Sequence, residues 1–108
     1  MVSLCRSRHI VPVLMTPPPV DPERAHSHWT AGTDYEKVNQ KISILCGLME
    51  EYAKKSKTAL IPLHDRFEAL LQANQNIRYL QDGIHPTKAG HRSIAHFVTD
   101  WAKKRFSS

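Results

Sequence analysis

Two short apolar segments, far apart in the chain, and the helical pattern between them constrain the fold more than any other feature. Residues 10–15 (IVPVLM) form a continuous apolar run rich in β-branched side chains, and residues 58–63 (TALIPL) form a second one. Such runs are typical of strands that are covered on both faces. A strand, a crossover helix and a second strand in this order predict parallel pairing in one sheet.

A long helix is predicted between the two apolar runs. Residues 33–36 (TDYE) fit a capping box, with Thr33 as the N-cap and Glu36 reaching back to its backbone. An apolar face follows at three- and four-residue steps, and the helix should end in the lysine-rich segment 54–57. This face consists of Val38, Ile42, Leu45, Met49 and Tyr52.

Other helices are predicted on either side of this unit. Residues 2–5 look like the last turns of a helix, a second helix should run from 64 to about 74, and a third from Thr87 to Phe106. The apolar face of the third consists of Ile94, Phe97, Val98 and Trp101. Residues 17–32 are rich in proline and histidine and have no periodicity, so they predict a long loop of the kind that often carries function.

The alternation of strands and helices predicts an α/β fold with a parallel sheet. Two parallel strands make an unusually small sheet, and residues 10–15 would have a long apolar edge without a neighbour. We therefore expect a part of a larger sheet, with the other strands before residue 1.

Composition fits one folded domain and excludes several classes of protein. With 108 residues, 41% of them hydrophobic and 23% charged, the chain is in the range of a single globular domain rather than a disordered tail. The net charge of +5 is scattered, except at residues 54–57 and 103–105 near predicted helix ends, where cations offset the helix dipole. We therefore expect no nucleic-acid partner.

The two cysteines and the N-terminal segment bear on location. Cys5 and Cys46 are not in a CxxC spacing, so we expect buried free thiols in a reducing compartment rather than a zinc knuckle or disulfides. Pro12 interrupts the N-terminal apolar run, which argues against a signal peptide. No stretch is long enough to span a bilayer. The expectation is a cytoplasmic protein without a membrane span.

The chemically most specific segment is residues 81–90 (QDGIHPTKAG), just before the last predicted helix. An imidazole can act as a general base near neutral pH because its ordinary pKa is about 6.5. It works best when a carboxylate holds Nδ1 and stabilises the imidazolium that forms. Asp82 and His85 could supply both groups from one loop, with Thr87 capping the helix. In the alternative interpretation Asp82 bonds backbone amides and His85 is a partly exposed polar residue.

The order of elements and the DGIHP sequence, followed by Thr87, Lys88 and Gly90, resemble the C-terminal part of the SGNH, or GDSL-type, serine esterases and lipases. The resemblance covers almost the whole chain. It implies a three-layer α/β/α sandwich with a flavodoxin-like parallel sheet, in which Asp82 is the acid and His85 the general base of a Ser-His-Asp triad. The implied substrates are small-molecule, lipid or acyl esters, with no cofactor and no metal. Residues 17–32 are also similar to those of isoamyl-acetate-hydrolysing esterase-like members.

The chain departs from that family in lacking the other half of the active site. The family's nucleophile lies in a Gly-Asp-Ser block, and its oxyanion hole uses that serine with a glycine and an asparagine. This sequence contains no GDS, no GxND and no GxSxG elbow. A base without a nucleophile does not hydrolyse esters. We therefore expect residues 1–108 to be one partial hydrolase domain that is inactive alone.

Two alternatives come from other classes of protein. One is a non-catalytic interaction module. The other is a histidine-rich metal-binding domain, in which His26 and His28 join His64 and Asp65, because imidazoles and carboxylates suit zinc. Trp29 beside these histidines is expected to line a substrate mouth or to cap the core.

Overall fold

The computed structural model describes residues 1–29, 32–73 and 79–106. The protein is a mixed α/β structure, mostly helical, with a small two-stranded parallel sheet. Its elements, in chain order, are α1 (Val2–Ser7), β1 (Val13–Met15), α2 (Pro22–His28), α3 (Tyr35–Ser56), β2 (Ala59–Ile61), α4 (Leu63–Ala73) and α5 (Lys88–Phe106). The predicted alternation is therefore confirmed, with one additional helix, α2.

The two strands pair in parallel, from Val13 opposite Ala59 to Met15 opposite Ile61, as the sequence predicts. A further hydrogen bond, from the Thr16 N–H to the Ile61 carbonyl at 3.1 Å, continues the ladder beyond β1.

Both strands are shorter than the apolar runs that predict them, because each run contains a proline. Proline has no N–H to donate to a ladder and is confined to strand ends and edges. Pro12 precedes β1, and Pro62 separates β2 from α4. Leu63 therefore begins α4, and its prediction as a strand residue is wrong.

The long helix α3 forms as predicted, but its N-cap is Asp34 rather than Thr33. The Asp34 carboxylate accepts the backbone N–H groups of Glu36 and Lys37 at 3.1 and 3.2 Å. A carboxylate at this position satisfies free N–H groups and also complements the positive end of the helix dipole. The helix ends at Ser56, with basic residues in its last turn as expected.

Helix α2 corrects the prediction that residues 17–32 form a loop throughout. Asp21 is its N-cap and accepts the Arg24 N–H at 3.5 Å, while Pro22 lies in the first turn, where its missing N–H removes no helical bond. The preceding run of prolines hides this short helix, because the segment as a whole has no apolar period.

Buried side chains form two small clusters. The first joins α4 and α5 to residues 79–80, and consists of Leu63, Phe67, Tyr79 and Leu80 with partly buried neighbours that include Ile94 and Phe97. The second joins α2 to α3, and consists of Val20, Ala25 and Tyr35 with Val38 and Ile42 packed against them. The predicted faces of α3 and α5 thus contribute to the core through their first halves.

The second half of α3 departs from its predicted face. Leu45 and Tyr52 are both 49% exposed, and the smaller Cys46 and Ala53 are buried instead. Cys46 and Cys5 are free thiols as predicted, although Cys5 is only half-buried.

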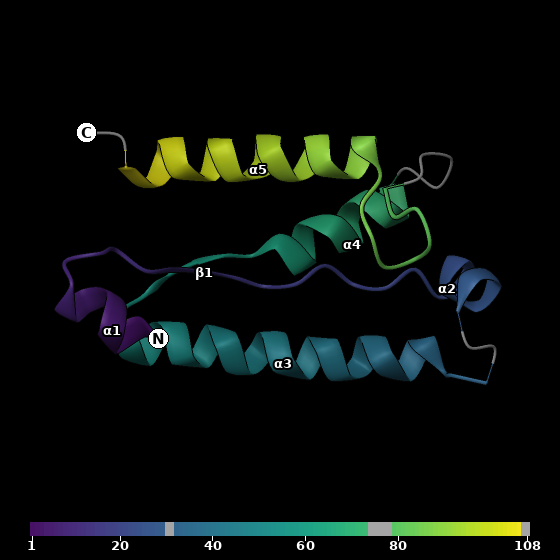
Figure 1. Cartoon of the computed structure of the whole chain (residues 1–108), viewed down its shortest axis with the longest axis horizontal. Coiled ribbons are helices and arrows are strands. Elements are labelled where there is room, and N and C mark those ends of the chain that lie inside the picture. The colour runs from purple at the N-terminus through teal and green to yellow at the C-terminus, as the bar shows by residue number, and fades with distance from the viewer. Residues whose placement is uncertain (30–31, 74–78, 107–108) are drawn as a thin grey trace.

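Figure 1 shows α3 on one side of the strands and α5 on the other. Helices α3 and α5 end near the amino ends of the two strands, whereas α2 and the segment before α5 lie toward their carboxyl ends (Figure 1). No helix in the described part of the chain is both long and apolar enough to cross a membrane.

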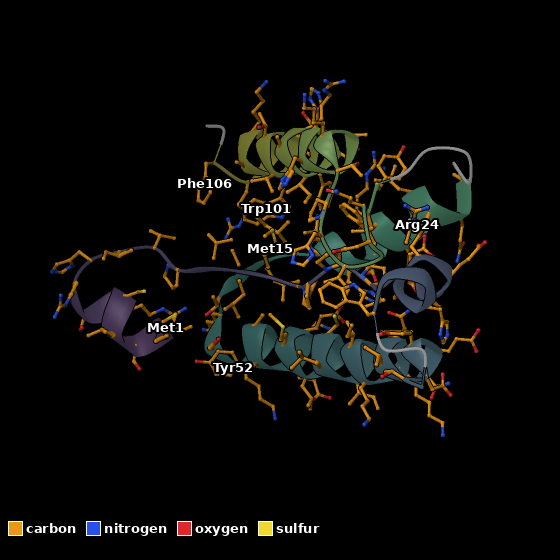
Figure 2. The ribbon with its side chains drawn as sticks, turned by 45° about the vertical axis from the view of Figure 1, so that its right-hand side comes forward. Met1, Met15, Arg24, Tyr52, Trp101 and Phe106 are labelled. Carbon is orange, nitrogen blue, oxygen red and sulfur yellow. The ribbon has the colours of Figure 1, made fainter. Side chains whose placement is uncertain are left out.

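The molecule is extended for its length. Its radius of gyration is 15.6 Å, whereas a compact domain of this size has about 13 Å. Large apolar side chains accordingly face solvent, and several of them lie on or next to β1 and on α3. Val13 and Met15 are 38% and 44% exposed on β1, and Val11 just before it is 70% exposed. Ile44 and Leu48 are 64% and 59% exposed on α3. Met15 and Tyr52 are labelled in Figure 2.

Candidate active site

The DGIHP turn, residues 82–86, is a closed loop between α4 and α5. An antiparallel bridge joins Leu80 to Pro86, and the Gln81 N–H donates to the His85 carbonyl at 2.7 Å. Thr87 caps α5 as predicted, since its hydroxyl accepts the Gly90 N–H at 3.1 Å. Both ends of the turn are therefore fixed by hydrogen bonds.

Asp82 and His85 contact each other within this turn. Asp82 Oδ2 lies 2.7 Å from His85 Nδ1, and Asp82 Oδ1 accepts the N–H groups of Ile84 and His85 at 2.9 and 2.7 Å. The His85 N–H first, then the His85 ring and the Ile84 N–H, hold the pKa of the Asp82 carboxyl well below its usual range, although desolvation opposes them. Asp82 is thus a carboxylate that fixes the imidazole through Nδ1.

The His85 side chain is largely open to solvent. The side chain is 65% exposed, and Nε2 has no hydrogen-bond partner among the described residues. With Nδ1 held by a carboxylate, Nε2 is the atom that can take a proton from a neighbouring hydroxyl. Asp82 makes the contacts of both interpretations, because it accepts two backbone N–H groups and also contacts the imidazole. A role of His85 as a general base stays a prediction.

Helix α2 holds the turn from outside. The Asp21 N–H donates to the Gly83 carbonyl at 2.9 Å, and Arg24 Nη2 donates to the Gln81 carbonyl at 2.9 Å. Gly83 has φ +89°, and a Cβ there would lie 2.6 Å from the Ala25 nitrogen. Only glycine fits this backbone conformation and close approach.

Trp29, directly after α2, lies beside the imidazole. Its Nε1–H donates to the Asp82 carbonyl at 3.2 Å, and its ring centroid is 6.1 Å from that of His85. The indole is 47% exposed, so the prediction that it caps the core is wrong, whereas a position at the mouth of a site remains a prediction. Asp21 and Arg24 are site-supporting residues that the sequence interpretation missed; the Asp-Pro helix start could have indicated them.

The serines with described side chains are not partners of His85. Ser7 Oγ donates to the Leu4 carbonyl at 2.8 Å, and Ser56 Oγ donates to the Tyr52 carbonyl at 2.7 Å. Ser3 lies on α1, Ser43 on α3 and Ser93 on α5, and none of them forms a hydrogen bond with His85. Among the serines with described side chains, none is therefore hydrogen-bonded to the Asp82–His85 pair.

The predicted metal ligands are not brought together as a set. The His26 ring packs edge-on against Tyr35 at 5.0 Å, and the His28 side chain lies outside the described part of the structure. His64 instead lies next to Asp65 and Glu68, and these three are the only group of possible ligands within 4.8 Å of one another among the described residues.

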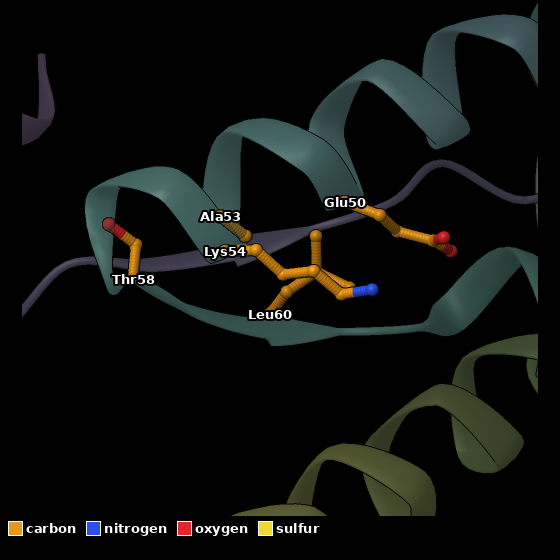
Figure 3. A pocket seen from close by; sticks show the side chains of 5 residues that line it. All are labelled: Glu50, Ala53, Lys54, Thr58 and Leu60. Carbon is orange, nitrogen blue, oxygen red and sulfur yellow. The ribbon is translucent and has the colours of Figure 1, made fainter.

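Two hollows lie away from the DGIHP turn. One, of about 240 Å³, lies between α3 and β2 and is lined by Glu50, Ala53, Lys54, Thr58 and Leu60 (Figure 3). The other, of about 350 Å³, lies near the amino ends of the strands, and Arg6, His9, Lys57 and Arg105 are among its lining residues. Its cations near the ends of α3 and α5 are explained by the negative ends of the helix dipoles.

No family model and no curated protein matches the chain.

Proposed function

We propose that this chain carries the acid–base half of the active site of a carboxylic-ester hydrolase of the SGNH, or GDSL, type. Asp82 orients and stabilises the imidazole of His85, and His85 Nε2 accepts the proton of a serine hydroxyl. The serine and its oxyanion hole come from residues outside this sequence, so the 108-residue chain alone does not turn over esters.

One observation carries the proposal: the 2.7 Å contact between Asp82 Oδ2 and Nδ1 of an imidazole whose side chain is 65% exposed. A merely structural pair has no need of an exposed second nitrogen, whereas a general base requires one that a substrate can reach. The second oxygen of Asp82 is fixed by two backbone amides, so the imidazole is held in a single tautomer and orientation.

The position of the pair in the fold supports the same proposal. In open parallel sheets, ligands bind outside the carboxyl ends of the strands, and the DGIHP turn lies toward these ends (Figure 1). We propose that the two strands and the helices on either side belong to a three-layer α/β/α sandwich, in which further strands pair with β1. Trp29 would then form one wall of the ester-binding site.

The test combines gene structure with a covalent probe. The open reading frame upstream of the Met1 codon is read, and the longest continuous protein is expressed beside the 108-residue chain. A fluorophosphonate probe, which labels activated serines, should label the longer protein at a Gly-Asp-Ser segment and leave the short chain unlabelled.

Variants of the longer protein then test the two roles. His85→Ala should abolish labelling and lower ester turnover by several orders of magnitude, and Asp82→Asn by somewhat less, since the imidazole loses its orienting carboxylate. Unchanged turnover in both variants would end the triad assignment.

The exposed apolar residues on β1 and α3 favour a second candidate, a non-catalytic interaction module. The reading frame upstream of the Met1 codon distinguishes the two functions. A closed reading frame upstream of Met1, with a stable and soluble 108-residue monomer, favours the module. A frame that encodes a Gly-Asp-Ser segment favours the hydrolase.

A further inference from the structure

His64 occupies a special place at the carboxyl end of the sheet. It follows β2 by three residues, and its backbone N–H donates to the hydroxyl of Thr16 at 3.0 Å, so it joins the ends of both strands. Its side chain is only 6% exposed. Nε2 is buried and has no hydrogen-bond partner among the described residues, which is uncommon for a buried polar atom.

The other ring nitrogen, Nδ1, is directed at two carboxylates of the same helix. It lies 3.6 Å from Asp65 Oδ1 and 3.9 Å from Glu68 Oε2, distances too long for hydrogen bonds. The spacing follows from the helix, because residues i and i+4 share a face at the first turns of α4. A buried imidazole thus faces two solvent-exposed carboxylates without a hydrogen bond to either.

This geometry fits a cation between the three side chains. Zinc binds imidazole nitrogen and carboxylate oxygen at about 2.0–2.2 Å, so neighbouring tetrahedral ligands are roughly 3.3–3.5 Å apart. The three ligand atoms lie within 4.8 Å of one another, and the two carboxylates, 71% and 52% exposed, can move closer to a shared cation. We propose that His64 Nδ1, Asp65 and Glu68 bind a divalent cation, with Zn²⁺ as the best match and water in the fourth position.

The surroundings are electrostatically suited to a cation. Burial first, and then the negative charges of Asp65, Glu50 and Glu68, raise the pKa of the Cys46 thiol on the facing helix α3. Three carboxylates therefore act on one small region between α3 and α4. A bound cation would neutralise part of this charge and give Nδ1 of His64 a ligand bond, while Nε2 would stay without a partner among the described residues.

The contacts of the second ring nitrogen of His64 bear on the expected affinity for Zn²⁺. Metal-ligating histidines usually donate their second ring N–H to an acceptor, which raises the affinity by about 10- to 100-fold. His64 Nε2 has no such acceptor among the described residues, so we expect micromolar rather than nanomolar binding. The site does not share a residue with the Asp82–His85 pair and does not depend on the proposed hydrolase function.

The experiment measures Zn²⁺ binding to the full 108-residue chain at low micromolar concentration, by competition with a fluorescent zinc indicator. The wild type is compared with Asp65→Asn/Glu68→Gln, which keeps the buried His64 in place. The control, Glu51→Gln/Asp100→Asn, changes the net charge equally at exposed carboxylates outside the group. Circular dichroism checks that all three proteins have the same helix content.

We expect the wild type and the control to bind one equivalent of Zn²⁺ more than 10-fold more tightly than Asp65→Asn/Glu68→Gln. In ¹⁵N NMR spectra, Zn²⁺ should shift the Nδ1 resonance of His64, and Mg²⁺ should not at the same concentration. The same binding curve for all three proteins, or a shift confined to the other histidines, would overturn the assignment.

Discussion

At the scale of single residues, Asp82 couples the stability of the fold to pH. Its carboxylate accepts two backbone N–H groups and contacts the His85 ring, which lowers its pKa below the ordinary value of about 3.9. A carboxyl whose pKa is lower in the folded state stabilises that state above the unfolded value. This contribution is lost as the pH falls through 3.9 toward the folded pKa.

The Asp82→Asn variant lacks this contribution at every pH. We therefore expect the wild type to be the more stable protein at pH 7, and the difference between the two to shrink between about pH 5 and pH 3. Urea unfolding midpoints of both proteins across this range measure the effect. A difference that stays constant with pH would mean that Asp82 does not act through its charge.

Gly83 gives a second residue-scale prediction. Its φ of +89° and the approach of α2 exclude a side chain, so Gly83→Ala should lower the free energy of unfolding by about 1–3 kcal/mol. Gly47→Ala is the matched control, because no atom lies within 4 Å of its added Cβ. Alanine in this helix interior should stabilise by up to about 1 kcal/mol. Equal effects of the two substitutions, measured by urea unfolding, would contradict the packing of α2 on the turn.

The sequence was sufficient to predict the pairing of Asp82 with His85, because both residues lie in one short turn. It was not sufficient for Trp29 and Arg24, whose contacts with the turn depend on the docking of α2. The proximity of Glu68 to His64 was not predicted either, although the two residues are four apart on α4 and share a face of that helix.

At the scale of elements, the start of α3 is capped by a different residue from the one that the sequence pattern predicts. The Thr33–Glu36 capping box is a good sequence match, yet Asp34 makes the hydrogen bonds. Asp34→Ala should therefore cost about 1 kcal/mol of stability, while Thr33→Ala should cost clearly less. Thermal unfolding followed by circular dichroism compares the stability of the two variants. A larger loss of stability for Thr33→Ala than for Asp34→Ala would support Thr33 as the N-cap.

The elements most easily predicted were those with a long period or a continuous apolar run. Helix α3 and the parallel pairing of β1 with β2 follow from such patterns. Helix α2 does not follow from such a pattern, because its seven residues are too few to show a period. Pro22 also argues against a helix unless it is placed in the first turn. The strand ends were misplaced because the apolar runs continue through Pro12 and Pro62 into segments with no ladder partner.

At the scale of the whole molecule, the extended shape and the exposed apolar side chains of β1 have a consequence for solubility. In the described structure β1 pairs with β2 alone, and an edge strand with apolar side chains promotes association between chains. We expect the chain to form larger species as its concentration rises, measured by sedimentation velocity. A monomer at all concentrations, with sharp cooperative unfolding, would contradict this.

Val13→Lys tests whether β1 is the cause. A charged side chain on an edge strand opposes pairing with another chain, so this variant should remain smaller at the same concentration. The control Lys57→Gln lowers the positive charge at an exposed position outside the strands and should associate at least as much as the wild type. Association of Val13→Lys equal to that of the wild type would place the contact elsewhere.

The distribution of charge along the long axis should orient the molecule on a charged surface. Lys54 and Lys55 in the last turn of α3, and Lys103–Arg105 in the last turn of α5, gather at the end of the molecule opposite the DGIHP turn. On a negatively charged bead or chip the protein should settle with this end down and His85 facing the bulk solution. Immobilisation would then orient the molecule without a tag, and a reagent in solution would reach the imidazole freely.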